Sequence, residues 1–547
     1  MAYFKSLREY IETLDKVGML TTIKNPINKD TELGPLVRLQ FRGLPEEERK
    51  GFLFTNVVDS RGNKYDIPCS MATTAATRQM YAVALQCKME EIPERLAQAY
   101  SNPIDPVMVE SGPVQEVVHI GDSLLEKGGM DQFPAPITTP GRDAGPVQSS
   151  SMWVTKDPDT GERNVGLYRS HIFAQDRMGI HLGQTDKDMV MHWQKCRSKG
   201  VPLQCAIVVG GPPNVVFVGP TRLPYGKDEY AVAGAIAGEA LELVKCKTVD
   251  IEVPANADVV IEGEMSTEEL EMEAPHGEGG GIVGMQEMQP FLKVTCITHR
   301  KNPIWHTLMS QLGPCDSGTV SRMHSTGMLY KRLKLDLKLP NVIQTGRPEF
   351  STGARGSVVL IQMKMHCPQD EVWRALEAAS GEYIIAVDDD IDVWHPDQFW
   401  WAVAMRALPH RDIKIVKGST TTMHLFKFMT EPESLKKRVT QFDPTQVEPV
   451  ENSHVLINAT LKWDYPPAAL PTKEFMEGAL RIWEKEGLPP LKLQAPWYSH
   501  ELGWWPQEFA DDAARAVRGE YYKTSEMRAQ KRQSTKDYPK IKPEGEK

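Results

Sequence analysis

The sequence predicts a mixed α/β protein of several domains, and three observations lead to this prediction. The chain has 547 residues, more than one hydrophobic core usually holds, so roughly two to four domains are expected. Residues 121–330 contain short runs of β-branched residues between Gly- and Pro-rich turns, which is typical of a β-barrel or sandwich with helical insertions. In residues 335–460 strand-like runs alternate with helical patterns, which indicates a parallel sheet with crossover helices.

The first domain is expected to cover residues 1–120 and to be a small α+β unit. Apolar residues at helical spacing predict a helix within 4–19, and an apolar run predicts a strand at 20–23. Further helices are expected at 76–87 and 90–100.

The central domain, residues 121–330, is expected to be mostly β-structure. Turn residues such as Gly210-Gly211-Pro212-Pro213 separate its apolar runs. The expected strands are 149–154, 165–173, 204–209, 215–218, 249–253, 259–261 and 291–297.

A C-terminal α/β domain is expected at 335–465, followed at 466–547 by helices and a tail that contact a second subunit. The domain's elements are a strand at 358–363, a helix at 369–379, a strand at 383–387 and a helix at 398–408. The later helices are expected at 472–486 and 507–519. Residues 523–547 hold few apolar side chains, so we expect them to be disordered unless a partner subunit anchors them.

Charge and composition exclude several classes of protein. Sixty-three basic against 73 acidic residues give a net charge of −10, which argues against a nucleic-acid partner. The sequence contains no apolar run of membrane-spanning length and no apolar signal core at its start. Its eight cysteines form no C-x-x-C pair, so a reducing cytoplasm is expected, with the thiols serving as small buried apolar groups.

Two short motifs carry the functional signal. Glu273 and Glu278 lie in the segment EAPHGEGGG, whose Pro and Gly residues indicate a tight irregular loop rather than a helix face. Upstream, Asn164 and Arg169 lie in NVGLYR, which offers a metal-ligand type and a fixed cation. Carboxylates on a constrained loop are typical of catalysis, although the spacing alone fits a solvated acidic turn equally well.

These segments closely resemble the UbiD-type decarboxylases, the 3-polyprenyl-4-hydroxybenzoate decarboxylase-like family. Further segments agree in the same order, so that the resemblance spans roughly residues 4–460. They are FKSLREYI at 4–11, PYGKDEYAVAG at 224–234, LVKCKTVDIEVP at 243–254 and VDDDIDVW at 387–394.

The resemblance implies a split β-barrel that holds prenylated FMN and a reversible, non-oxidative decarboxylase or carboxylase. The expected substrate is an aromatic or heteroaromatic carboxylic acid, or its CoA thioester. Loss of CO₂ from an sp² carbon leaves electrons that no protein side chain can accept, so a cofactor must serve as the electron sink.

The resemblance also assigns three catalytic residues. Arg169 is expected beside the flavin and paired with Glu273, since a guanidinium can hold a carboxylate bidentately even when buried. Glu273 should then stay ionised. Glu278 is expected to protonate the carbon that loses CO₂.

For the cofactor, the resemblance implies that Asn164 and Glu229 bind a divalent Mn²⁺ or Mg²⁺ ion that bridges to the flavin phosphate, with K⁺ nearby. The implied flavin-binding residues are Asn164, Leu167, Tyr168, Arg169, Gln184, Pro220 and Glu229.

The sequence departs from the family at two places. A His that the family uses as third metal ligand aligns with residues 185–187, which contain no His. Thr185 or Asp186 could replace it, His181 could reach the ion through a shifted loop, or the ion could be weakly held; we assign Thr185. The second departure, Gly279-Gly280-Gly281, suggests a mobile loop or a wide pocket.

An alternative function comes from the acidic run that follows the predicted strand 383–387. Asp388 and Asp390 form a D-x-D pattern, which favours a metal-dependent nucleotide-sugar glycosyltransferase. The family resemblance instead makes these residues structural. It further implies a small aromatic substrate and CO₂, a flavin prenyltransferase that supplies the cofactor, and a homodimer or homohexamer.

Overall fold

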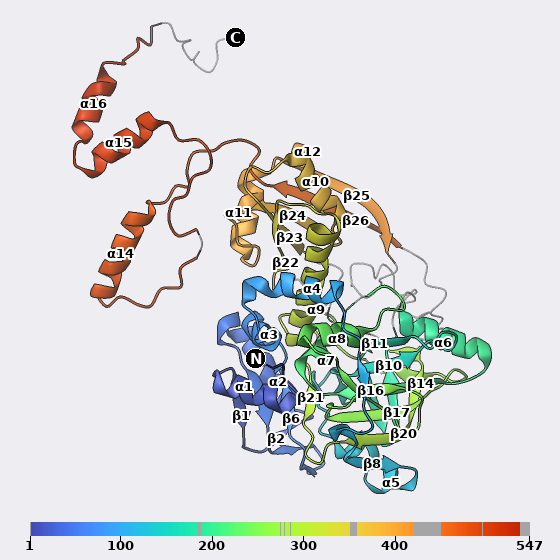
Figure 1. Ribbon diagram of the computed structural model, residues 1–547. Helices are drawn as coiled ribbons and strands as arrows, with labels where there is room; N and C mark the ends of the chain where they lie inside the picture. The colour runs from blue at the N-terminus through green and yellow to red at the C-terminus, as the bar shows by residue number, and fades with distance from the viewer. Residues whose placement is uncertain are drawn as a thin grey trace, which may run out of the picture. The chain divides into compact units, whose positions relative to one another are not determined.

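The computed structural model describes residues 2–182, 187–221, 223–273, 275–277, 279, 281–284, 286–350, 358–420, 450–494 and 496–536. The chain divides into two compact units, Met1–Ala459 and Thr460–Lys547. The first is a mixed α/β unit with several sheets, which confirms the predicted fold class (Figure 1).

The N-terminal part begins with the amphipathic helix α1, Leu7–Lys16. Its N-cap is Ser6, whose hydroxyl accepts a hydrogen bond from the amide of Glu9, 3.3 Å away. Three further helices follow: α2 (Leu33–Gly43), α3 (Arg78–Leu85) and α4 (Ile92–Ser101).

A four-stranded sheet joins this part of the chain to a much later segment. The order is β1 (Leu20–Ile23), β3 (Gly51–Phe54), β6 (Cys69–Met71) and β21 (Trp305–Thr307). Because β21 pairs directly with β6, the N-terminal and central segments share one sheet.

The central feature is a curled antiparallel sheet of nine strands (Figure 1). The path runs β11 (Arg163–Leu167), β10 (Met152–Lys156), β14 (Leu203–Val209), β17 (Val259–Met265), β20 (Phe291–His299), β13 (Arg177–Ile180), β12 (Ser170–Ala174) and β9 (Val147–Gln148), and β8 (Val117–Ile120) pairs with β20.

The curl brings the two ends of this sheet together at one point. Only Tyr168 and Arg169 separate β11 from β12 in the chain, yet the two strands stand near opposite ends of the sheet order. The indole of Trp153, on β10, donates a hydrogen bond of 2.9 Å to the hydroxyl of Ser170, on β12. The sheet is therefore nearly closed, and we call the two-residue link the seam.

Helices cover this sheet, and one of them corrects a sequence prediction. Residues 215–218, expected to be a strand, lie in helix α7, Pro213–Val218. Pro213 suits the first turn of a helix, and every residue of α7 is buried, so burial outweighs the β-propensity of the valines. The other helices are α6 (Asp188–Lys199), α8 (Glu229–Ala237) and α9 (Asp316–Tyr330), which runs on into the π-helical η5 (Lys331–Asp336).

Small sheets complete the central part. The strand expected at 249–253 begins only at Glu252, because Val249 and Ile251 form a tight turn through a 2.9 Å hydrogen bond. The short strands are β2 (Ile27–Asn28), β4 (Val57–Val58), β5 (Lys64–Tyr65), β7 (Val107–Met108), β15 (Glu242–Lys245), β16 (Glu252–Pro254), β18 (Glu271–Glu273) and β19 (Glu287–Gln289).

The C-terminal sheet of the first unit has the expected parallel pairing at its centre, and its two edge strands are antiparallel. Its order is β22 (Val342–Gly346), β23 (Val358–Met363), β24 (Tyr383–Asp388), β26 (Val450–Ala459) and β25 (Ile413–Thr420). Only β23–β24 and β24–β26 are parallel. The edge strands pair antiparallel with their neighbours, so no helical crossover is needed to place them there.

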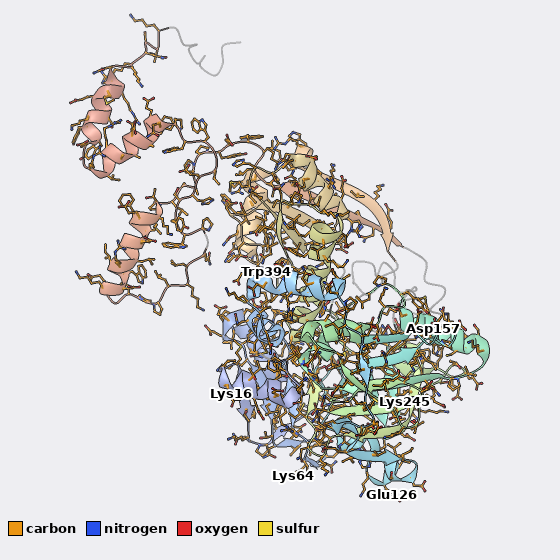
Figure 2. The ribbon with its side chains drawn as sticks, viewed as in Figure 1. Lys16, Lys64, Glu126, Asp157, Lys245 and Trp394 are labelled. Atoms are coloured by element: carbon orange, nitrogen blue, oxygen red, sulfur yellow. The ribbon has the colours of Figure 1, made fainter. Side chains whose placement is uncertain are left out.

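Each face of this sheet carries a helix. Alternate residues of β24 point to opposite sides, so that Ile384 joins a core with α10 (Gln369–Ala378) and Ile385 joins one with α11 (Pro396–Arg406). Trp394, labelled in Figure 2, lies under the guanidinium of Arg78, 4.7 Å from its ring centroid. This contact ties the C-terminal sheet to the N-terminal helices.

The second unit contains α14 (Lys473–Lys485), α15 (Gln507–Val517) and α16 (Tyr521–Ala529). The last helix corrects the expectation of disorder from residue 523 onward. The guanidinium of Arg515 donates to the hydroxyl of Thr524 over 3.0 Å, and Arg528 pairs with Asp512, so polar contacts join α16 to α15. Residues 537–547 lie outside the described residues.

All eight cysteines are free thiols. Six are buried and the other two, Cys87 and Cys246, are partly buried, as expected for small apolar side chains. Among the described residues no helix combines the length and apolar character that a membrane span requires.

Candidate active site

The first part of the site lies on β11, at the edge of the curled sheet. Asn164 is buried, and its side-chain nitrogen has no hydrogen-bond partner. The next residue, Val165, donates its amide to a carboxylate oxygen of Glu229, 2.9 Å away, at the start of α8. The structure therefore brings together two of the three residues that the sequence suggested as metal ligands.

Glu229 occupies an unusual electrostatic position. Its side chain is 4% exposed, and burial raises the pKa of this carboxyl to about 8, with nearby Asp228 and Asp188 adding to the rise. An amide oxygen beside a desolvated carboxylate is a suitable ligand pair for a hard cation. Among the described residues no group of three His, Cys, Asp or Glu side chains is arranged to hold a metal, so these two would need the help of other donors.

The next two flavin-binding candidates are Tyr168, in the seam, and Leu167, at the end of β11. Gly166 allows the ring of Tyr168 to lie over it, because a Cβ at Gly166 would meet that ring at 2.3 Å. The amide of Leu167 donates to the carbonyl of Gly219 over 3.0 Å, which brings β11 beside Pro220. The ammonium of Lys187 lies 4.7 Å from the Tyr168 ring centroid.

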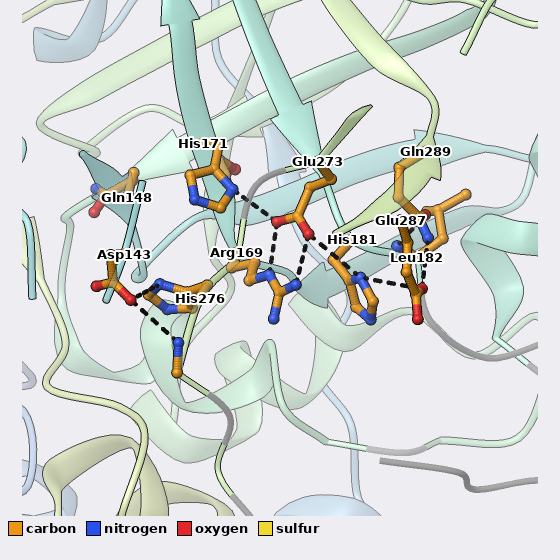
Figure 3. A network of polar contacts seen from close by, with 12 residues as sticks. Asp143, Gln148, Arg169, His171, His181, Leu182, Glu273, His276, Glu287 and Gln289 are labelled. Atoms are coloured by element: carbon orange, nitrogen blue, oxygen red, sulfur yellow. Dashed lines mark hydrogen bonds and ion pairs between the residues drawn. The ribbon is translucent and has the colours of Figure 1, made fainter. Parts of the chain in front are cut away.

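Arg169 and Glu273 form the pair that the sequence suggested. The guanidinium holds the carboxylate with two parallel hydrogen bonds, Nε–Oε1 at 2.8 Å and Nη2–Oε2 at 2.7 Å (Figure 3). Glu273 is 1% exposed. Burial alone would raise its pKa, but Arg169 and two histidines outweigh burial and hold the pKa well below the usual value. Glu273 therefore stays ionised at neutral pH.

Two histidines that the motifs did not single out as partners of Glu273 complete its surroundings. Nδ1 of His171, on β12, lies 2.7 Å from Oε1 of Glu273, and Nε2 of the same buried ring has no hydrogen-bond partner. Nδ1 of His181 lies 3.7 Å from Oε2 of Glu273 and 4.0 Å from Glu287 (Figure 3). The ring of His181 thus lies between the carboxylates of Glu273 and Glu287.

The part of the EAPHGEGGG motif that follows Glu273 lies in the loop between β18 and β19, residues 274–286, which we call the glutamate loop. A bridge between Gly277 and Val283 narrows it, and the amide of Gly284 donates to the carbonyl of His276 over 2.7 Å. Glu278, Gln184 and Thr185, named from the sequence as proton donor, flavin contact and third metal ligand, lie outside the described residues.

A large cavity adjoins the flavin-binding candidates. It has a volume of about 1260 Å³ and is lined by Pro220, Asp228, Tyr100 and His324, among others. The imidazole of His324 lies 2.8 Å from the hydroxyl of Thr221 and 3.1 Å from that of Tyr81. Through His324, helix α9 thus contacts both Thr221, which follows Pro220, and Tyr81 of helix α3.

The acidic run at the end of β24 corrects the alternative function. Asp388 and Asp390 are both bound by Arg406, Nη1 of which lies 2.9 Å from Oδ2 of Asp388 and 2.8 Å from Oδ1 of Asp390. The guanidinium itself is buried. One buried guanidinium thus holds both carboxylates in an ion cluster of the C-terminal sheet, and the nucleotide-sugar interpretation is not supported.

The curled sheet thus carries a buried arginine–glutamate pair at its seam and a buried asparagine and glutamate at its β11 edge. Two family models match this chain: the 3-octaprenyl-4-hydroxybenzoate carboxy-lyase Rift-related domain over residues 107–312, and the C-terminal domain of the same enzymes over residues 329–446. The chain belongs to this family, the UbiD carboxy-lyases, whose members are decarboxylases.

Two relatives match most of the length of this chain. An uncharacterized protein of Archaeoglobus fulgidus is 29% identical over 447 residues, 77% of this chain and 88% of the relative. One from Aquifex aeolicus is 27% identical over 519 residues, 89% of this chain and 99% of the relative.

Among solved structures, an evolved dimeric form of the UbiD-class enzyme HmfF from Pelotomaculum thermopropionicum, in complex with prenylated FMN, matches with a TM-score of 0.71 and 25% identity, covering 86% of this chain and 98% of that one. HmfF with FMN gives a TM-score of 0.70 at 26% identity, covering 84% and 95%. Vanillic acid decarboxylase from Sedimentibacter hydroxybenzoicus, at 23% identity and a TM-score of 0.70 over 88% of this chain and 100% of that one, shares the fold.

Proposed function

We propose that this carboxy-lyase uses prenylated FMN to remove CO₂ reversibly from an aromatic or heteroaromatic carboxylic acid, or from its CoA thioester. The observation that carries the proposal is the buried pair of Arg169 and Glu273 at the seam, in a fold shared with HmfF bound to prenylated FMN. When bound, the cofactor supplies the electron sink that decarboxylation at an sp² carbon requires.

The residues of the site divide the remaining work. Arg169, fixed by Glu273, presents a permanent positive charge at the seam, which suits an anionic carboxylate substrate. The negative charge of Glu273 keeps this guanidinium oriented. Glu278 is proposed to hold the proton and deliver it to the carbon that loses CO₂, or to remove it in carboxylation.

Asn164 and Glu229 fit a divalent cation at the flavin phosphate. The carboxylate of Glu229 is buried beside the strand that carries Asn164, whose side-chain oxygen is of the type that hard cations bind. Mn²⁺ or Mg²⁺, with K⁺ nearby and Thr185 as a third ligand, would be held by these oxygens and would balance the charge of Glu229. Leu167, Tyr168, Gln184 and Pro220 are proposed to line the flavin.

The activity also implies partners. Because no protein side chain makes prenylated FMN, a flavin prenyltransferase must supply it, and protein produced without that enzyme should be inactive. We further propose a homodimer or homohexamer, in which helices of the second unit contact a neighbouring subunit. That unit buries little apolar surface of its own.

The test is Glu278→Gln in protein produced together with a flavin prenyltransferase. An amide cannot donate the proton, so CO₂ release from a panel of aromatic acids should fall by about 10²- to 10⁴-fold, while flavin absorbance of the purified protein should not change. Glu269→Gln, an exposed residue near β18, is the matched control and should retain full activity. Wild-type turnover by Glu278→Gln would remove Glu278 from the mechanism, and full activity without bound flavin would overturn the proposed function itself.

A further inference from the structure

The glutamate loop is held from outside by a carboxylate that the sequence motifs do not include. Asp143 lies 134 residues before Gly277 in the chain, is 8% exposed, and contacts two consecutive residues of the loop. The amide of Gly277 donates to Oδ1 of Asp143 over 3.2 Å. Nδ1 of His276 lies 3.2 Å from the same oxygen (Figure 3).

The two oxygens of Asp143 have separate tasks. Oδ1 faces His276 and Gly277, whereas Oδ2 is held by its own segment. Oδ2 accepts from the amide of Thr139 at 2.8 Å and from the hydroxyl of Thr138 at 3.0 Å. Burial alone would raise the pKa of Asp143, but the contacts with His276 and with the backbone amides of Thr139 and Gly277 lower the pKa, so the carboxylate stays charged.

Gln311 and Arg38 support Asp143 through further hydrogen bonds. The side-chain nitrogen of Gln311 lies 3.3 Å from Oδ2 of Asp143 and 2.6 Å from the hydroxyl of Thr138. Arg38, on helix α2, in turn donates to the Gln311 side-chain oxygen over 3.1 Å and to the backbone carbonyl of Leu312 over 2.7 Å. A chain of hydrogen bonds thereby connects the N-terminal helix α2 to the glutamate loop.

The same contacts leave no room for a side chain at Gly277. A Cβ there would meet Cγ of Gln311 at 2.6 Å, so the loop backbone packs directly against the side chain of Gln311. On the other side, the ring of His276 meets the ring of His171 edge to face, with centroids 5.7 Å apart and planes at 84°. His171 bonds Glu273, so His276 is fixed between Asp143 and the surroundings of Glu273.

We propose that Asp143 is a positioning residue of the glutamate loop, fixing His276 and Gly277, the two residues immediately before Glu278 in the chain. This inference rests on the proposed function, in which Glu278 carries the proton. Asp143 would then set where that proton is delivered, with Gln311 and Arg38 as its supports.

The first measurement needs no activity. Backbone hydrogen–deuterium exchange, followed by mass spectrometry of peptides that contain Gly277, should become faster by about tenfold or more in Asp143→Ala, because the Gly277 amide loses its acceptor. The matched control is Asp59→Ala, which removes another buried carboxylate that bonds its own turn, at Arg61 and Asn63. Unchanged exchange at Gly277 in Asp143→Ala would overturn the proposal.

The second measurement uses the protein loaded with prenylated FMN. In Asp143→Ala, kcat should fall by about 10²-fold because a displaced catalytic group loses its alignment, while KM and flavin content change by less than about threefold. Adding Asp143→Ala to Glu278→Gln should cause little further loss, since both changes disable one step. If the fold-losses in kcat of the two single variants multiply in the double variant, Asp143 acts on a different step from Glu278.

A third variant covers the case in which Asp143→Ala does not fold. His276→Phe keeps the ring against His171 and removes the nitrogen beside Asp143, and it should lower kcat at unchanged KM. Wild-type kcat in that variant would count against the proposal. If wild-type protein releases CO₂ from none of the acids, the proposed function fails, whereas the exchange experiment still decides whether Asp143 anchors the loop.

Discussion

At the residue scale, the chemistry of the site depends on buried charges that neutralise one another. Glu273 accepts two hydrogen bonds from Arg169 and contacts two histidines, although almost no solvent reaches it. Taking a single charge out of such a cluster leaves its partner buried without compensation, which costs more than the pair itself contributes.

Glu273→Gln should therefore destabilise the protein strongly, by about 3–5 kcal/mol, because the largely buried guanidinium of Arg169 keeps its charge and loses the carboxylate that accepts two of its hydrogen bonds. The lowered pKa of Glu273 means that its stabilising effect is fully present above the unfolded pKa of about 4.3. The effect is lost only as the pH falls through the lower folded value. Thermal unfolding at pH 7 and pH 5 should show the same deficit.

The control for this change is Glu271→Gln on the same strand. Glu271 pairs with Arg177 at 3.0 Å, but both side chains are more than a third exposed, so the expected loss is within about 1 kcal/mol. Equal effects of the two substitutions would contradict the importance assigned here to burial.

At the element scale, helix α9 begins with an acidic residue in an unfavourable environment. Asp316 is fully buried and neither of its side-chain oxygens has a hydrogen-bond partner. Burial raises the pKa of this carboxyl to about 8. Because the folded pKa lies above the unfolded one, the folded protein holds an extra proton between about pH 4 and pH 8 and loses stability as the pH rises through that range.

Asp316→Asn should consequently stabilise the protein at high pH. The gain is expected to be a few kcal/mol, on the order of what a buried uncompensated carboxylate costs, at pH 9 and close to zero at pH 4. Asp370→Asn, in the exposed first turn of α10, should act in the opposite direction by about 0.3–1 kcal/mol, because it removes a favourable charge at a helix N-terminus. Thermal melts from pH 4 to pH 9 measure both.

How much of each element could be predicted depended on whether the element has an exposed face. Helices 369–379 and 472–486 and the strands near 358–363 and 383–387 were found within one or two residues, because apolar periodicity or a β-branched run marks them. Helix α7 is buried on all sides, so its valines show no helical period and read as a strand. Helix α9 buries Arg322 and His324 as well as apolar residues, and no pattern predicted it.

The same reasoning applies to the site. Arg169 and Glu273 could be named because each lies in a short motif, and the structure contains their pair. Asp143 and Gln311 come from separate segments that meet only in the folded chain, so no local spacing reveals them. His171 lies only two residues after Arg169, but its contact with Glu273 appears only in the folded chain. The histidine inside EAPHGEGGG was the one available signal. The roles given to Glu278, Gln184 and Thr185 stay predictions.

At the scale of the whole molecule, the second unit has helices whose apolar faces are exposed. Helices α14 and α15 are amphipathic, yet neither has a buried residue, and Ile482 and Val517 are each 62% exposed. Such faces are normally covered by other protein. We expect a neighbouring copy of the chain to cover them.

Light scattering should accordingly find at least a dimer at micromolar concentration. Ile482→Glu, which places a charge in the apolar face of α14, should shift the protein toward monomer, whereas Glu484→Gln on the same helix should leave the assembly unchanged. A monomeric wild-type protein would contradict the expectation.

The cysteines have a practical consequence for following the opening of this fold. Burial is the largest cause that raises the pKa of every one of the eight thiols, so few exist as the thiolate that alkylating reagents attack. Reaction of a thiol then reports the moment at which its surroundings separate. Cys69 lies in the four-stranded sheet, Cys205 in the curled sheet and Cys367 beside the C-terminal sheet. The rate at which each of these thiols is alkylated therefore reports how fast its own sheet opens.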